Sequence, residues 1–208
     1  MRKYFLLGFL LFFSLFFLGC KKTSNTTNSA SQIELLSGDS AQALESLNNN
    51  LAQAKEAAKG WKNNAQFTAI VLKITPETKT DNLTETFVFG SPDDSQNWWT
   101  YSITPTTDKV VRSLTPKEDY LGTNFQPIQE TYLKISYIEA LNSAETDQGV
   151  VFRANNPNYQ IGLVLGQTAP KNWLWWQVEY QSADSFQKIL VNASDGQIYD
   201  ENGNPISS

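Results

Sequence analysis

The sequence predicts an α+β fold made of two tandem repeats, each with one helix packed on a small antiparallel sheet of about four strands. Three observations support this prediction. Two segments place apolar residues at helical spacing, several short segments alternate apolar and polar residues between proline-containing breaks, and this order of helix and strands occurs twice. We therefore expect a folded body of two similar halves.

The first 19 residues are typical of a secretory signal and not of the folded body. The chain begins with MRK, which supplies two positive charges, and continues with an apolar run over residues 4–18. This run is shorter than the roughly 20 residues that a membrane-spanning helix needs. It ends in FLGC at 17–20, and we expect residues 1–19 to be removed.

The FLGC segment resembles the lipobox of bacterial lipoproteins, in which a small residue precedes a cysteine that receives a diacylglyceryl group. By this resemblance Cys20 is the lipidation site and Gly19 the last residue of the signal peptide. The resemblance implies a protein anchored by lipid to the cell membrane or outer membrane, facing outside the cytoplasm. The alternative is an uncleaved signal anchor with an incidental cysteine.

Charge and composition restrict the partners and place a tether after the anchor. The chain has 16 Lys and Arg against 21 Asp and Glu, a formal charge of −5, and removal of residues 1–19 with their two cations makes it −7. This charge argues against nucleic acid or anionic lipid as the main partner. Residues 20–37 are mostly small and polar, which predicts a flexible tether.

Residues 38–122 form the first predicted repeat. Leu44, Leu47 and Leu51 recur at helical spacing and predict a helix over 40–59, with Ser40 as its cap and Gly60 at its end. Strands are expected where β-branched and aromatic residues follow, because prolines and small polar residues separate these segments. The expected strands are 66–74, 84–90, 97–103 and 109–114.

A linker at 123–133 leads to the second predicted repeat at 134–202, which a short tail at 203–208 follows. Ile135, Ile138 and Leu141 predict a helix, and Ser136 with Glu139 three residues later matches a capping box. The expected strands are 149–154, 159–166, 173–180 and 186–193.

The tryptophan-rich strands supply the candidate site. Aligning NWWTYSI (97–103) with LWWQVEY (174–180) makes Trp98 equivalent to Trp175 and Trp99 to Trp176. Side chains alternate between faces along a strand, so one face of each strand is predicted to enter the core. The predicted core residues are Trp99, Tyr101 and Ile103 in the first strand, and Trp176, Val178 and Tyr180 in the second.

Trp98, Trp173 and Trp175 are predicted to lie on the opposite face and to bind a partner. Exposed tryptophan is costly in water but enriched among residues that dominate binding affinity. Two alternatives would cover these rings. The two repeats could pack sheet against sheet, or the extended segment at 123–132 could lie over them.

Three segments of the second half carry a family resemblance: ISYIEALNSAETDQG in the helical region, WWQVEY in a strand, and ILVNASDGQIYD at the end. Over about 134–200 they resemble a PepSY domain, and the first half resembles one more loosely. The resemblance implies a non-catalytic module outside the cytoplasm that binds or restrains peptidases.

The residue inventory predicts neither an enzyme nor a cofactor or metal site. The chain has no histidine, and lipidation would occupy its one cysteine. Ser185 and Lys188 have the S-x-x-K spacing of one catalytic class, but in a strand they point to opposite faces. The carboxylate pairs at 93–94 and 200–201 lie in turn-like sequence.

The leading hypothesis is therefore a lipid-anchored binding protein with a protein or peptide partner, a peptidase among them. The first alternative is a structural or assembly accessory lipoprotein whose sheet faces are internal. A second alternative is carbohydrate binding through stacked tryptophan rings.

Overall fold

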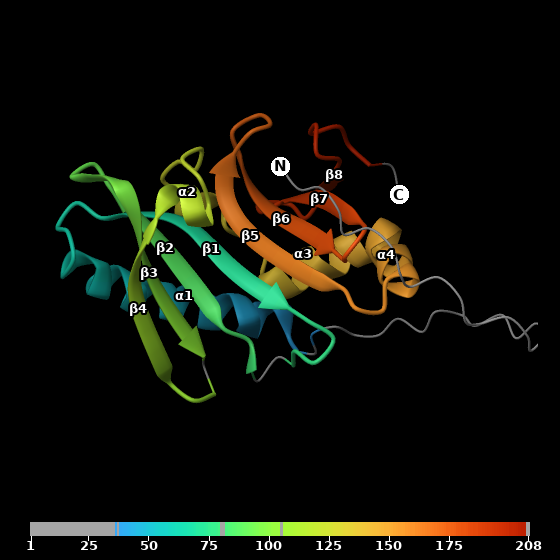
Figure 1. Ribbon diagram of the computed structural model, residues 1–208, viewed down its shortest axis with the longest axis horizontal. Coiled ribbons are helices and arrows are strands. Elements are labelled where there is room, and N and C mark those ends of the chain that lie inside the picture. Colours follow the sequence, from blue (N-terminus) through green and yellow to red (C-terminus); the bar gives the residue numbers. More distant parts are fainter. Residues whose placement is uncertain (1–35, 37, 80–81, 105, 207–208) are drawn as a thin grey trace, which may run out of the picture. The chain divides into compact units, whose positions relative to one another are not determined.

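The computed structural model describes residues 36, 38–79, 82–104 and 106–206, so the predicted signal peptide and Cys20 lie outside the described residues. The described residues all belong to one compact unit, Gln32–Ser208. They form an α+β fold with one eight-stranded antiparallel sheet, as Figure 1 shows. The predicted fold class is confirmed.

The first half contains one long helix and four strands. Helix α1 spans Ser40–Lys59, the residues predicted, and Gly60 follows it. Its cap is Asp39 and not Ser40, because the Asp39 carboxylate accepts a hydrogen bond of 2.9 Å from the backbone N–H of Gln42. The strands that follow are β1 (Gln66–Ile74), β2 (Glu85–Ser91), β3 (Asp94–Thr104) and β4 (Lys109–Pro116).

The second half repeats this plan with a helical segment before its strands. The Ser136 hydroxyl caps α3 by accepting from the Glu139 N–H at 3.2 Å, as the capping box predicted. Two short helices lie between the halves, α2 (Lys117–Tyr120) and η2 (Glu130–Tyr132). The second-half elements are α3 (Tyr137–Ala144), η3 (Glu145–Gly149), α4 (Val150–Asn155), β5 (Gln160–Thr168), β6 (Trp173–Gln181), β7 (Phe186–Asn192) and β8 (Ile198–Tyr199).

The strand predicted at 149–154 is wrong, because this segment continues the helix through η3 into α4. The apolar residues at 150–152 suggested a strand, but contacts distant along the chain favour the helix. Arg153 bonds to Glu145 through two nitrogens at 2.9 and 2.5 Å, and Tyr180 donates to the same carboxylate at 2.7 Å. A Cβ at Gly149 would collide with the Tyr180 hydroxyl, so glycine allows this close approach.

The two halves join edge to edge in a single sheet. The strand order is β4-β3-β2-β1-β5-β6-β7-β8, and β1 pairs with β5 over the residues from Ala69↔Gly166 to Ile74↔Ile161. The order of strands outward from this central pair is the same in both halves (Figure 1). The alternative that the repeats pack sheet against sheet is therefore wrong.

The predicted equivalence of the two tryptophan-rich strands is also wrong. Trp98 and Trp99 lie on β3, the third strand of the first half, whereas Trp175 and Trp176 lie on β6, the second strand of the second half. The error follows from the false strand at 149–154. Because it was taken as the first strand of the second half, the segment that forms β6 was taken as the third strand and not the second.

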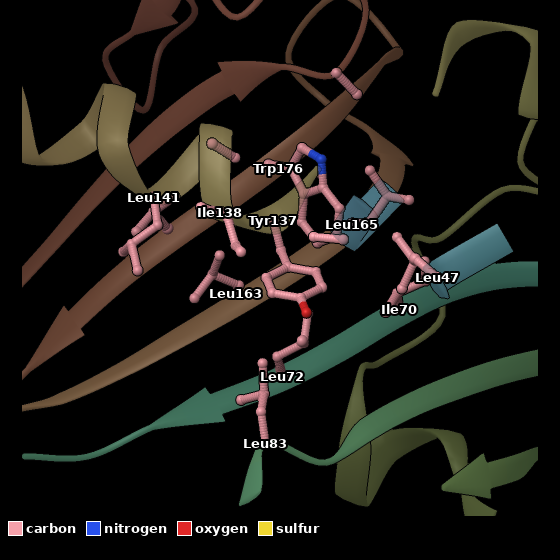
Figure 2. Close-up of a cluster of buried hydrophobic side chains, with 14 of the residues drawn as sticks. Leu47, Ile70, Leu72, Leu83, Tyr137, Ile138, Leu141, Leu163, Leu165 and Trp176 are labelled. Carbon is pink, nitrogen blue, oxygen red and sulfur yellow. The ribbon is translucent and has the colours of Figure 1, made fainter. Parts of the chain in front are cut away.

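One continuous core lies between the helices and the sheet. Figure 2 shows side chains of both halves meeting there, with Leu47 and Leu72 from the first half and Tyr137, Leu163 and Trp176 from the second. The predicted core residues are all buried in this cluster, namely Trp99, Tyr101, Ile103, Trp176, Val178 and Tyr180. The period-two pattern therefore assigned both strands to the correct face.

The connection between the halves, residues 117–135, begins on the face of the sheet opposite the helices and ends against the helix-side core, and we name it the crossing segment. Phe125 packs against the cluster of Ala69, Val88 and Trp98 on that face. The backbone then reaches the central strands, where Ile128 N–H donates to Phe67 O at 2.8 Å. A Cβ at Gly166 on β5 would collide with the Phe125 ring, so glycine makes room for the crossing segment.

Gly166→Ala should destabilise the fold by about 1–3 kcal/mol, because the added methyl group overpacks the contact with Phe125. Urea unfolding followed by tryptophan fluorescence measures the loss. Gly162→Ala is the matched control, since its Cβ would meet nothing nearer than Glu179 Cβ at 3.9 Å. The loss should shrink in the Phe125→Ala background, and an unchanged loss there would contradict the proposed contact.

Candidate binding site

The three predicted site tryptophans all project from the face opposite the helices, but they differ in exposure. Trp98 is 3% exposed and Trp175 is fully buried, whereas Trp173 is 41% exposed. The segment predicted to cover such rings does cover Trp98, through Phe125. Of the three residues, only Trp173 offers surface to a partner.

Trp98 is held beneath the start of the crossing segment. Its indole N–H donates to the backbone carbonyl of Gly122 at 3.1 Å, and the Lys117 ammonium lies 4.3 Å from the ring centroid. Leu121 and Phe125 pack against the same cluster. These contacts satisfy both the polar and the apolar parts of the indole, which makes Trp98 a structural residue.

Trp175 is buried in a second aromatic cluster, with Tyr199 and Leu190. Its ring meets the Tyr199 ring edge to face at 5.2 Å, and its indole N–H donates to Pro170 O at 3.0 Å. β8 and the β5–β6 turn therefore cover this ring. Trp175 is also a structural residue. Its ring centroid lies 5.3 Å from the ring centroid of Trp173.

Trp173 stands at the outer side of this cluster beside the turn that connects β5 and β6. Lys171 and Asn172 in this turn both adopt the left-handed conformation, with φ of 63° and 56°. The Lys171 ammonium lies 4.5 Å from the Trp173 ring and 4.9 Å from the Tyr199 ring. This arrangement places a cation against the exposed indole, an interaction of about 0.5–1 kcal/mol at an exposed site.

A cleft of about 370 Å³ adjoins Trp173, and we name it the Trp173 cleft. Its lining side chains are uncharged, and among them the Tyr132 ring is half exposed. Ser194 Oγ donates to Tyr132 O at 3.0 Å, which ties the crossing segment to the end of β7. The lining residues are Gln129, Tyr132, Gln167, Asn172, Trp173, Leu174, Asn192 and Ser194.

Gln167 contributes a feature that sequence reasoning missed. Within the described part of the chain, its Oε1 is the one buried side-chain nitrogen or oxygen without a hydrogen-bond partner. An unpaired buried acceptor costs free energy, and this one belongs to a residue that lines the Trp173 cleft. For Trp173, the sequence contained one signal of exposure. The polar residues Lys171 and Asn172 stand directly before it.

The buried titratable groups form structural contacts elsewhere. Glu85 is almost fully buried and accepts a hydrogen bond of 2.8 Å from Asn50 Nδ2. Burial raises the pKa of the Glu85 carboxyl above its usual value, and the bond from Asn50 opposes this shift. Burial and the charge of Glu85 raise the pKa of Tyr137 to about 12.

The cluster of Glu145, Arg153 and Tyr180 binds the helical segment to β6. Burial, followed by the charge of Glu145, raises the pKa of the Tyr180 hydroxyl, so Tyr180 stays protonated and donates to Glu145.

Over the residues that the structure describes, no group of three or more Asp, Glu, His or Cys side chains is placed to hold a metal ion. Among the same residues, none of the helices has both the length and the apolar character of a membrane span.

Comparison with known proteins gives one structural similarity. No protein-family model matches the chain, and no curated protein matches it. A crystal structure of a Clostridium difficile 630 protein, described as a "putative lipoprotein", aligns with 72% of this chain and 89% of its own at 12% identity and a TM-score of 0.44. A similarity at this TM-score supports no inference about fold or function.

Glu85→Gln should increase stability at pH 7 by on the order of 1 kcal/mol, because it removes a buried charge and keeps an acceptor for Asn50. The folded-state pKa is raised, so the protonated Glu85 stabilises the fold below the unfolded value of about 4.3, and this stability is lost as pH rises through the folded-state pKa. The difference between variant and parent should therefore be near zero at about pH 4 and grow toward pH 7.

Urea unfolding at both pH values measures this difference. Glu77→Gln serves as the control, because Glu77 is exposed. An equal difference at both pH values would show that the ionisation of Glu85 is not the cause.

Proposed function

We propose that this chain is a lipid-anchored binding protein of the bacterial envelope, attached through Cys20 and facing outside the cytoplasm. The support is the order of the N-terminal sequence, with two cations, an apolar run and FLGC at 17–20, in which the only cysteine stands at the lipobox position. Acyl chains on Cys20 would hold the protein at the membrane, since each buried methylene contributes about 0.8 kcal/mol. The folded body would then act by binding and not by catalysis.

The proposed partner is a protein or peptide, and the PepSY resemblance of 134–200 implies an extracytoplasmic peptidase as its class. The observation that carries this proposal is the exposure of Trp173 beside the Trp173 cleft. A large ring at the border of an uncharged cleft suits the centre of an interface, where tryptophan dominates affinity. Tyr132 extends the same surface from the crossing segment.

A second candidate function is a structural or assembly accessory lipoprotein. The burial of Trp98 and Trp175 favours it, because that hypothesis predicts tryptophans that are covered within the protein itself. The two candidates differ in what they require of Trp173. Only the binding protein needs this side chain for its activity.

Cys20→Ser should abolish incorporation of labelled palmitate in a bacterial host, because the hydroxyl does not replace the thiol in lipid transfer. Labelling followed by membrane fractionation measures the result. A control variant combines Cys20→Ser with Ser24→Cys, which restores a cysteine away from the FLGC segment. Label on either variant would contradict lipidation directed by this segment.

Trp173→Ala should weaken partner binding about 30-fold, a loss of about 2 kcal/mol, if Trp173 lies at the centre of the interface. Crosslinking in membranes with a photoreactive group at Ser194, followed by mass spectrometry, identifies the partner and compares its yield. Phe186→Ala is the matched control, because Phe186 is more exposed than Trp173 and does not line the cleft. Equal yield from Trp173→Ala would exclude the Trp173 site and favour the accessory function.

A further inference from the structure

Strand β4 forms an uncovered outer edge of the sheet, at the end of the strand order opposite β8 (Figure 1). Among the described residues β3 is its only strand neighbour, and seven of its eight residues are exposed. The exposed side chains include large apolar ones, with Val111 at 51% and Leu114 at 55%. An edge strand of this kind presents a row of backbone N–H and C=O groups to solvent.

The opposite edge of the sheet is protected, which makes the exposure of β4 distinctive. β8 has two residues, and the chain after it folds back so that Tyr199 bridges to Pro205. Ile206 N–H donates to Ile198 O at 3.0 Å in the same contact. The two halves share a plan, yet only the first half leaves a long outer strand open.

Both faces of β4 combine apolar and cationic side chains. Register with β3 places Val110, Arg112 and Leu114 on the helix side, because they lie opposite the core residues of β3. The Arg112 guanidinium lies 5.7 Å from the Tyr101 ring. Lys109 and Val111 alternate with these residues and face the other side.

A groove lies near the start of β4, although no residue of β4 lines it. It has a volume of about 420 Å³ and lies between α1 and the β3–β4 turn, with Ile103, Glu45 and Asp108 among its lining residues. Because two of these residues are acidic, the groove suits the uncharged side chains of an added strand and not its carboxylates. Helix α1 packs on β2 and β3, so β4 extends beyond its cover.

We propose that the β4 edge binds an extended peptide segment with acidic and apolar side chains, which adds to the sheet as a further strand. Backbone hydrogen bonds along β4 would supply affinity, and Lys109 and Arg112 would select carboxylates. Charged edge residues discourage pairing with a random strand, and an acidic strand neutralises them. A second copy of this chain fits less well, because each copy carries the same two cations, Lys109 and Arg112, on β4.

The test uses the full-length chain purified in detergent and a blocked octapeptide that carries both glutamate and valine or threonine on each face of an extended strand. Calorimetry at low salt should detect binding of this peptide, and a version with lysine in place of glutamate should bind about tenfold more weakly or not at all. Two further versions carry N-methyl groups on the odd or on the even residues. Strand addition uses one peptide edge, so one of these versions should lose binding and the other should retain it.

Protein variants complete the design. Arg112→Glu should weaken binding of the acidic peptide about tenfold and improve binding of the lysine peptide. Lys73→Glu is the matched control, because Lys73 is exposed on β1 in the interior of the sheet. Trp173→Ala should leave peptide binding unchanged, so this proposal and the proposed function fail independently.

Three results would overturn the proposal. The first is that the acidic peptide fails to bind. The second is that both N-methylated versions bind as well as the parent peptide, and the third is that Arg112→Glu has no more effect than Lys73→Glu. Sedimentation that shows a dimer of the native chain, lost in Arg112→Glu, would assign the edge to a second copy instead.

Discussion

Ile70 of β1 and Leu165 of β5 lie opposite each other and are fully buried, at the point where the two halves meet. This pairing determines the rest of the structure. Because β1 and β5 have one register, the apolar side chains of both halves point to the same side and the helices share one core. A shift of one residue would turn the apolar side chains of one half toward the opposite face. The face away from the helices is then left for the first part of the crossing segment and for the aromatic clusters.

Much of the fold could be predicted because its signals are local. The period of Leu44, Leu47 and Leu51 predicted α1, and alternation predicted which face of β3 and of β6 enters the core. The segment 149–154 was mispredicted because β-branched residues favour a strand locally, whereas the bonds of Glu145 to Arg153 and Tyr180 favour a helix. The second of these contacts joins residues 35 positions apart, and no local pattern reports such a pair.

The candidate site shows the same limit. Alternation placed Trp98, Trp173 and Trp175 on the correct face, but their exposure depends on what lies over them. Phe125 covers Trp98, and Tyr199 covers Trp175, from segments that adjoin neither ring in sequence. Trp173 keeps its exposure because it begins β6 beside a turn. The Trp173 cleft is formed by three separate stretches of chain, so its existence could not be inferred from any one of them.

The strand order has a consequence for the origin of the chain. The central strands β1 and β5 are antiparallel, and the other strands follow in the same order on either side of them. A two-fold axis between β1 and β5 would generate this arrangement. Half of this molecule, paired with a copy of itself through β1, would form a sheet of the same order. Gene duplication and fusion of such a dimer would produce the present chain. The crossing segment would then be the addition that converted two subunits into one polypeptide.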